Sequence, residues 1–183
     1  AGAGRGEPEG GLRPGTGRMK FHVVTAMHNF GPWIEANVQS VMLQSDPDFR
    51  CVLVDDMSTD DTVERARRTI GADPRFRVVA NRERKYKARN VSDGIAMTGA
   101  EDGDVIVMID GDDRLADANV FARLREVYDR PECWMTYGSC VDAQGRRTDV
   151  SQPYAADIIR QNTYRRHKWL AFHLKTFRYG LWK

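Results

Sequence analysis

From Lys20 onward, short apolar runs alternate along the chain with stretches in which apolar residues recur every three or four positions. Each apolar run is typical of a strand buried on both faces of a parallel sheet. These runs are "FHVVTAM", "RCVLVDD", "FRVVAN" and "DVIVMID". Because strands alternate with helices, we expect an α/β fold with a doubly wound, mostly parallel sheet and helices on both faces.

Helix signals separate the predicted strands. Pro32 opens the first helix, which carries Ile34, Val38, Val41 and Met42 on one face. Ser58 and Asp61 have the spacing of a capping box at the start of "STDDTVERARRTI". The segment "KARNVSDGIAMTG" ends at Gly99, and "DANVFARLREVYD" places Val120, Phe121, Leu124, Val127 and Tyr128 on one face. Farther along, we expect a strand and a hairpin turning at Ala143–Gly145, and then two helical segments within 155–176.

The composition fits a globular domain and distinguishes the two ends of the chain from it. The 183 residues are 41% apolar and 30% charged, which fits one globular domain over 19–183 after a flexible glycine-rich leader at 1–18. A net charge of +2 gives no support to general nucleic-acid binding. Three cysteines without metal or disulfide spacing favour a reducing, cytoplasmic setting. The aromatic C-terminal stretch leads us to expect that the natural chain continues past Lys183.

Three carboxylates follow the fourth predicted strand directly, at Asp110, Asp112 and Asp113. Like charges this close repel, so a neutralising cation is expected, and Mg²⁺ or Mn²⁺ takes such oxygen ligands. The alternative is a solvated turn in which Asp112 or Asp113 caps the next helix. An EF-hand is excluded because position twelve, counted from Asp110, is Phe121 and not glutamate.

Other polar groups follow the first two strands and converge on the same sheet edge, where ligands bind in such folds. Asp55 and Asp56 end the second strand and can accept hydrogen bonds from a ligand, whereas Asp60 and Asp61 are explained by helix capping. His28 follows the first strand and is either a ligand contact or a structural histidine. A basic run, whose cations can hold a phosphate, comprises Arg82, Arg84, Lys85, Lys87 and Arg89.

Taken in order, "VLVDDMSTDDT", "KARN" and "VIVMIDGDD" resemble the family-two inverting glycosyltransferases, which have the GT-A nucleotide-sugar fold. The resemblance implies a donor site in which Ala26 and His28 pack on the nucleoside and Asp56, beside Asp55, binds the base. It implies that Lys87 and Arg89 form the basic part of the site. It also implies that Asp110 and Gly111 lie near the ribose, with Asp110, Asp112 and Asp113 holding Mn²⁺ or Mg²⁺ at the diphosphate.

The function implied by this resemblance is metal-dependent sugar transfer from a nucleotide donor, with UDP favoured, to an acceptor hydroxyl with inversion. The acceptor is a glycan, a lipid-linked molecule or a protein. No residue can be named as catalytic base, since Asp149 and Asp157 do not have a matching context. We therefore expect the base and the acceptor part to lie beyond Lys183.

Other readings stay open at this stage. One alternative is a chain that binds a nucleotide sugar without turnover. Another is a phosphatase of the haloacid-dehalogenase type with "MIDGDD" as its motif, although Arg114 departs from that motif. A response-regulator receiver leaves the first strand and helix unexplained. The basic and aromatic C-terminal segment suggests either contact with a membrane surface or packing against a further segment, and a homo-oligomer is possible.

Overall fold

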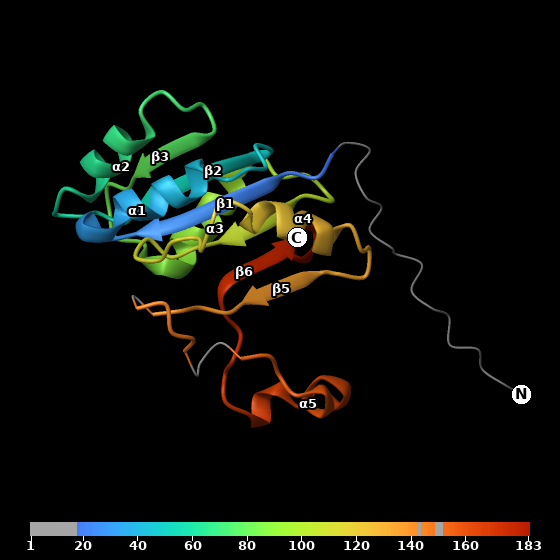
Figure 1. Ribbon diagram of the computed structural model, residues 1–183. Helices are drawn as coiled ribbons and strands as arrows, with labels where there is room; N and C mark the ends of the chain where they lie inside the picture. Colours follow the sequence, from blue (N-terminus) through green and yellow to red (C-terminus); the bar gives the residue numbers. More distant parts are fainter. Residues whose placement is uncertain (1–17, 143, 149–151) are drawn as a thin grey trace, which may run out of the picture.

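The computed structural model describes residues 18–142, 144–148 and 152–183, which form one six-stranded mixed sheet covered by helices (Figure 1). The sheet has the strand order β3-β2-β1-β4-β6-β5. Its strands are β1 (Phe21–Met27), β2 (Phe49–Asp55), β3 (Phe76–Ala80), β4 (Val105–Met108), β5 (Met135–Gly138) and β6 (Phe172–Arg178). The helices are α1 (Gly31–Met42), α2 (Thr62–Ile70), α3 (Tyr86–Thr98), α4 (Val120–Tyr128) and α5 (Ala156–Gln161), with short 3₁₀ turns η1 (Tyr164–Arg166) and η2 (Tyr179–Leu181).

The four strands predicted from the apolar runs form the parallel part of the sheet. β1 lies between β2 and β4, and β3 extends the sheet beyond β2. Both faces of β1 and β4 are buried, which explains why these strands read as continuous apolar runs. Strand order reverses between β1 and β4, and the carboxyl ends at such a switch point are where α/β sheets bind ligands.

Helices cover both faces of the sheet, as predicted. The larger core joins α1, α2 and α4 to one face through residues such as Ile34, Ala66 and Phe121. The smaller core joins α3 to the other face, where Val91 and Ile95 pack on β1 and β4. The helix α3 approaches the sheet closely because Gly94 has no side chain; a Cβ there would lie 2.6 Å from a methyl group of Val24.

The sequence prediction is wrong at the C-terminal end of the sheet. Only α5 and η1 are helical within 155–176, whereas Phe172–Arg178 forms β6, antiparallel to both β4 and β5. Tertiary pairing decides this segment: Thr176 is fully buried, and its hydroxyl lies 2.6 Å from those of Tyr128 and Thr136. β5 pairs with β6, and within the described residues the expected local hairpin contains the bridge between Val141 and Arg147.

Smaller corrections concern the helix boundaries. The capping box is wrong, because Ser58 donates to Asp55 and α2 begins only at Thr62. Asp60, which precedes this helix, accepts from the backbone N–H of Thr62 at 3.1 Å. Val127 is part of α4 but remains exposed.

The predicted leader and the turn at Ala143 fall on or largely on residues outside the described ranges, as does Asp149. Cys51 is buried within β2, and this burial raises the pKa of its thiol. Among the described residues, no helix combines the length and the apolar character needed to cross a membrane.

A candidate nucleotide-sugar and cation site

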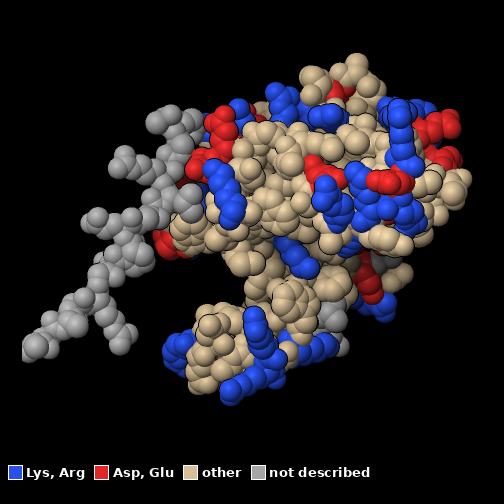
Figure 2. Space-filling view, turned by 180° about the vertical axis from the view of Figure 1, so that it is seen from behind, with Lys and Arg blue, Asp and Glu red and all other residues tan. Residues whose placement is uncertain are grey.

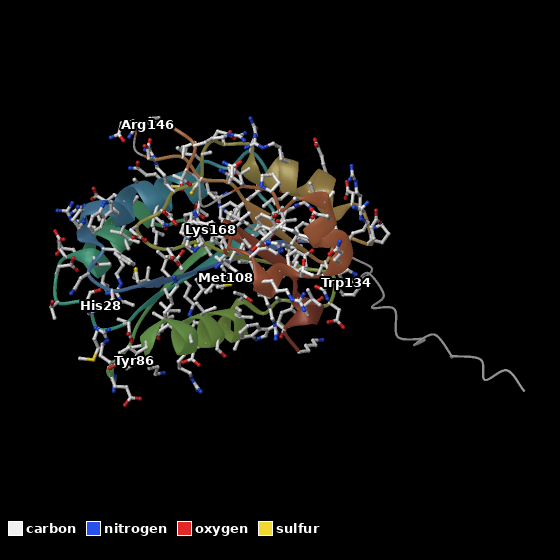
Figure 3. The ribbon with its side chains drawn as sticks, turned by 90° about the horizontal axis from the view of Figure 1, so that it is seen from below. His28, Tyr86, Met108, Trp134, Arg146 and Lys168 are labelled. Carbon is white, nitrogen blue, oxygen red and sulfur yellow. The ribbon has the colours of Figure 1, made fainter. Side chains whose placement is uncertain are left out.

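A cleft of about 340 Å³ opens at the carboxyl ends of β1 and β4, between the loops that follow β1, β3 and β4. His28, from the loop after β1, and Tyr86, the first residue of α3, lie near each other at one end of the sheet (Figure 3). The cleft is lined by Ala26, Met27, His28, Phe30, Asp56, Arg84, Tyr86, Lys87, Asn90, Asp110 and Asp112. Residues far apart in sequence meet here because parallel strands end at a common edge.

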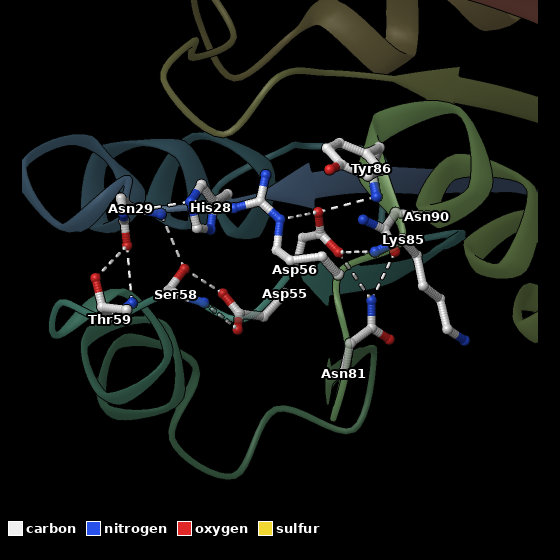
Figure 4. Close-up of polar contacts among 11 residues, drawn as sticks. His28, Asn29, Asp55, Asp56, Ser58, Thr59, Asn81, Lys85, Tyr86 and Asn90 are labelled. Carbon is white, nitrogen blue, oxygen red and sulfur yellow. Dashed lines mark hydrogen bonds and ion pairs between the residues drawn. The ribbon is translucent and has the colours of Figure 1, made fainter.

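Asp56 lies at one end of the cleft and holds several neighbouring groups, although the residue is only 3% exposed (Figure 4). The backbone N–H groups of Lys85 and Tyr86 donate to its two oxygens at 2.7 and 3.0 Å. Arg84 Nε forms an ion pair with it at 3.0 Å. Burial works to raise the pKa of Asp56, but the neighbouring Asn90 amide and these backbone donors outweigh it and lower the pKa to about 2. Asp56 is therefore an anion that anchors the segment before α3.

This anchored segment presents an aromatic and cationic surface to solvent. Tyr86 has a left-handed backbone, with φ at 61°, and the residue is 69% exposed. The guanidinium of Arg84 lies 5.3 Å from the centre of the Tyr86 ring and also donates to Nε2 of His28. An exposed ring beside a guanidinium is suited to stacking on a planar ligand such as a nucleobase.

The opposite end of the cleft is the turn after β4, which α1 holds in place. The side-chain amide of Asn37 donates to the carbonyl oxygens of Asp110 and Asp113 at 2.9 and 2.8 Å. Asn37 is 1% exposed, and the N–H of Asp113 closes the turn by donating to the carbonyl of Asp110 at 3.0 Å. The buried amide thus fixes the backbone from which the two carboxylates project.

Asp110 and Asp113 meet a histidine that comes from β6. One oxygen or nitrogen from each of Asp110, Asp113 and His173 lies within 4.8 Å of the others. Lys87 Nζ approaches Asp110 Oδ2 at 2.6 Å from the α3 side. Two carboxylates and an imidazole form a donor set that a divalent transition-metal ion accepts. Asp112 also lines the cleft but lies outside this group of the described residues.

The structure does not bring every predicted residue into the cleft. Asp55 is buried and accepts from the hydroxyl and the backbone N–H of Ser58, so it stabilises the loop after β2. Arg89 points away from Lys87, because residues two apart on a helix lie on different faces, and it pairs with Asp93 at 2.8 Å. Gly111 is buried beneath the Phe30 ring, so its role is close packing.

The residues that shape the cleft or its cation end but were not identified from the sequence include Asn37, Arg84, Tyr86 and His173, together with the lining residues Met27, Phe30 and Asn90. Arg84 belongs to the basic run, but nothing in the sequence distinguishes it from its neighbours. The pairing of β4 with β6 brings His173 to the site, and that pairing was not predicted. Asn37 is recognisable in retrospect as a polar residue on the apolar face of α1.

Comparison with known proteins agrees with the fold described above. The sequence profile described as Glycosyl transferase family 2 matches residues 22–181. No curated protein sequence matches the chain significantly.

Solved structures of PcManGT and TarS are among those that share the fold. The mannosyltransferase PcManGT from Pyrobaculum calidifontis, in complex with GDP-Man and Mn²⁺, superposes with a TM-score of 0.66 at 21% identity. That match covers 91% of this chain and 46% of PcManGT. Residues 1–349 of S. aureus TarS, in complex with UDP-GlcNAc, superpose with a TM-score of 0.66 at 19% identity, covering 87% and 45% of the two chains. The chain thus spans less than half the length of either neighbour.

The sheet order and the cleft at its switch point define a GT-A fold, a Rossmann-like nucleotide-sugar fold. The match over nearly the whole described domain shows that this chain belongs to glycosyl transferase family 2. This family assignment replaces the two alternative interpretations of the acidic motif, as part of a phosphatase or of a response-regulator receiver.

Proposed function

We propose that this chain forms the donor site of an enzyme that transfers a sugar from a nucleoside diphosphate to an acceptor hydroxyl, with inversion and with a divalent cation. The observation that carries the proposal is the composition of the single cleft described above. An exposed aromatic and cationic surface at Arg84 and Tyr86 lies at one end, and the carboxylates Asp110 and Asp113, which would hold the cation, lie at the other. Membership in glycosyl transferase family 2 supports the same reaction class.

Each end of the cleft has a separate task in this proposal. Asp56 holds the backbone at Lys85 and Tyr86, so that the base stacks on a fixed surface. Lys87, now paired with Asp110, is placed to contact a diphosphate oxygen as well. A cation held by Asp110 and Asp113 would supply charge stabilisation to the departing nucleoside diphosphate.

We infer that UDP is the nucleotide and Mn²⁺ or Mg²⁺ the cation. The names of the structural neighbours support both inferences by analogy: TarS is in complex with UDP-GlcNAc, and PcManGT is in complex with GDP-Man and Mn²⁺. Because those two donors carry different bases, GDP is the necessary comparison.

Calorimetric titration tests the donor site. UDP should bind in the presence of Mn²⁺, more weakly after chelation with EDTA, and GDP should bind less tightly than UDP. Asp110→Asn should abolish the effect of Mn²⁺ on UDP affinity. The matched control is Asp117→Asn, because Asp117 follows on the same loop but pairs with Arg123 outside the cleft. Equal UDP affinity with and without Mn²⁺ would remove the proposal.

The second candidate function is nucleotide-sugar binding without transfer by this chain alone. The carboxylates that line the cleft in the described residues are Asp56, Asp110 and Asp112. Asp56 is occupied by its donors, and the other two belong to the cation end, so none is placed to deprotonate an acceptor. Release of sugar without transfer, or binding without turnover, would favour this candidate. The anomeric configuration of any transferred sugar, read by NMR, tests inversion.

We also propose that the lobe formed by residues 152–171 contacts an anionic membrane surface, where a lipid-linked acceptor would lie. The lobe extends away from the sheet, and cationic side chains gather on it (Figure 2). Asp157 is the sole acidic residue from Gln152 to Lys183. The exposed cations Arg160, Arg165, Arg166 and Lys168 stand beside Trp169, which is 62% exposed. Cations attract anionic headgroups, and tryptophan is favoured at the interface.

A further inference from the structure

His173 lies at the candidate cation site because of the register between β4 and β6. Met108 pairs with Lys175 in this antiparallel ladder. Asp110 follows the end of β4 by two residues and His173 precedes Lys175 by two, so both lie just beyond the last pair of this ladder. The antiparallel pairing of β4 with β6 therefore brings His173 to the turn that carries Asp110.

The His173 side chain lies between the two carboxylates. Its Nε2 is 3.3 Å from Asp110 Oδ2, and its Nδ1 is 2.7 Å from Asp113 Oδ2. The side chain is only 19% exposed. Nδ1 is buried yet forms no hydrogen bond with the described residues, despite the short separation from Asp113. A nitrogen and an oxygen that face each other without a hydrogen bond are arranged as two ligands of one cation would be.

The separations also fit a shared ion. Ligand atoms about 2.0–2.2 Å from a cation lie at most about 4.4 Å from one another. The three donors of Asp110, Asp113 and His173 fall within 4.8 Å, so small side-chain rotations suffice. Lys87, which now approaches Asp110 Oδ2, would turn toward the diphosphate.

We propose that His173 is a nitrogen ligand of the divalent cation and that it makes the site prefer Mn²⁺ to Mg²⁺. Mg²⁺ is a hard ion that takes oxygen ligands and retains water. First-row transition-metal ions such as Mn²⁺ accept an imidazole nitrogen more readily, so a histidine ligand favours Mn²⁺ over Mg²⁺. This inference rests on the proposed donor site and adds to it a ligand from β6 and a metal preference.

Electron paramagnetic resonance of bound Mn²⁺ tests the assignment directly. Electron spin-echo modulation should show a coupled ¹⁴N nucleus in the wild-type protein, and incorporation of ¹⁵N-histidine should replace it with a ¹⁵N signal. His173→Gln should lose the coupling while keeping a polar side chain of similar length. Its Mn²⁺ affinity should fall at least tenfold, with a smaller fall for Mg²⁺. His167→Gln is the matched control, because His167 follows η1 on the exposed lobe.

The outcomes separate this inference from the proposed function. Mn²⁺-dependent UDP binding without histidine coupling would overturn the role of His173 and leave the donor site standing. The same holds if His173→Gln keeps its coupling or its ratio of Mn²⁺ to Mg²⁺ affinity. Histidine coupling without any UDP binding would support the ligand and overturn the nucleotide proposal. No Mn²⁺ binding at all overturns both. Circular dichroism of His173→Gln verifies that the variant is folded.

Discussion

Replacing Asn37 by alanine should loosen the turn that carries Asp110 and Asp113. The mutation removes two hydrogen bonds, at 2.9 and 2.8 Å, from a side chain that is almost fully buried. The carbonyl of Asp110 keeps a second donor, the N–H of Asp113, so its loss is one net hydrogen bond, about 1 kcal/mol. The carbonyl of Asp113 loses its amide donor inside the protein, which costs about 1–3 kcal/mol. The free energy of unfolding should therefore fall by roughly 2–4 kcal/mol.

Urea unfolding followed by circular dichroism measures this change, and a Mn²⁺ titration in the absence of urea measures its effect on the cation site. We expect weaker Mn²⁺ binding, because the carboxylates no longer project from a fixed backbone. Gln39→Ala is the control, since Gln39 is exposed on the same helix. An unfolding free energy for Asn37→Ala within about 0.5 kcal/mol of the wild type would refute the assigned role of the amide, because that is the usual range of surface substitutions.

Three further predictions test other parts of the structure. The folded-state pKa of Asp56, about 2, lies below its ordinary value, so its stabilisation is complete above about pH 4 and lost as pH falls toward 2. Asp56→Asn should lower stability at pH 7 and flatten the pH dependence of urea unfolding between pH 4 and 2; an unchanged slope counts against the assignment. Gly111→Ala places a methyl group against the Phe30 ring and should lower the unfolding free energy by about 1–3 kcal/mol, whereas an unaltered midpoint would show that the ring moves aside freely. Replacing Arg165 and Arg166 together by glutamate should abolish co-sedimentation with vesicles containing phosphatidylserine without altering UDP affinity; undiminished sedimentation, or equal wild-type binding to neutral vesicles, would contradict the membrane proposal.

Much of the fold could be predicted from local pattern. Strands buried on both faces are mostly apolar, so β1, β2 and β4 are visible as short, predominantly apolar runs. Helices that cover a sheet bury only one face, which leaves the periodic pattern seen in α1. Polar residues directly after buried strands then indicate the ligand edge, and Asp56 and Asp110 were found in this way.

The features that the sequence did not predict have a common physical cause, because each depends on contacts between distant segments of the chain. β6 has no distinctive local pattern, and it becomes a strand because β4 and β5 supply its hydrogen bonds. Arg84 and Arg89 are equivalent in composition, but the start of α3 directs one toward Asp56 and the other toward Asp93.

The sequence by itself therefore determined the α/β alternation, the edge of the sheet at which the cleft opens and two of the carboxylates that line this cleft, Asp56 and Asp110. These features are predictable because the burial of a strand and the position of its carboxyl end are visible in the pattern of neighbouring apolar and polar residues. Only the tertiary structure decided which partners these carboxylates meet. Asn37 and His173 lie far from Asp110 in the sequence, and they reach it through helix packing and an antiparallel register that no local pattern encodes.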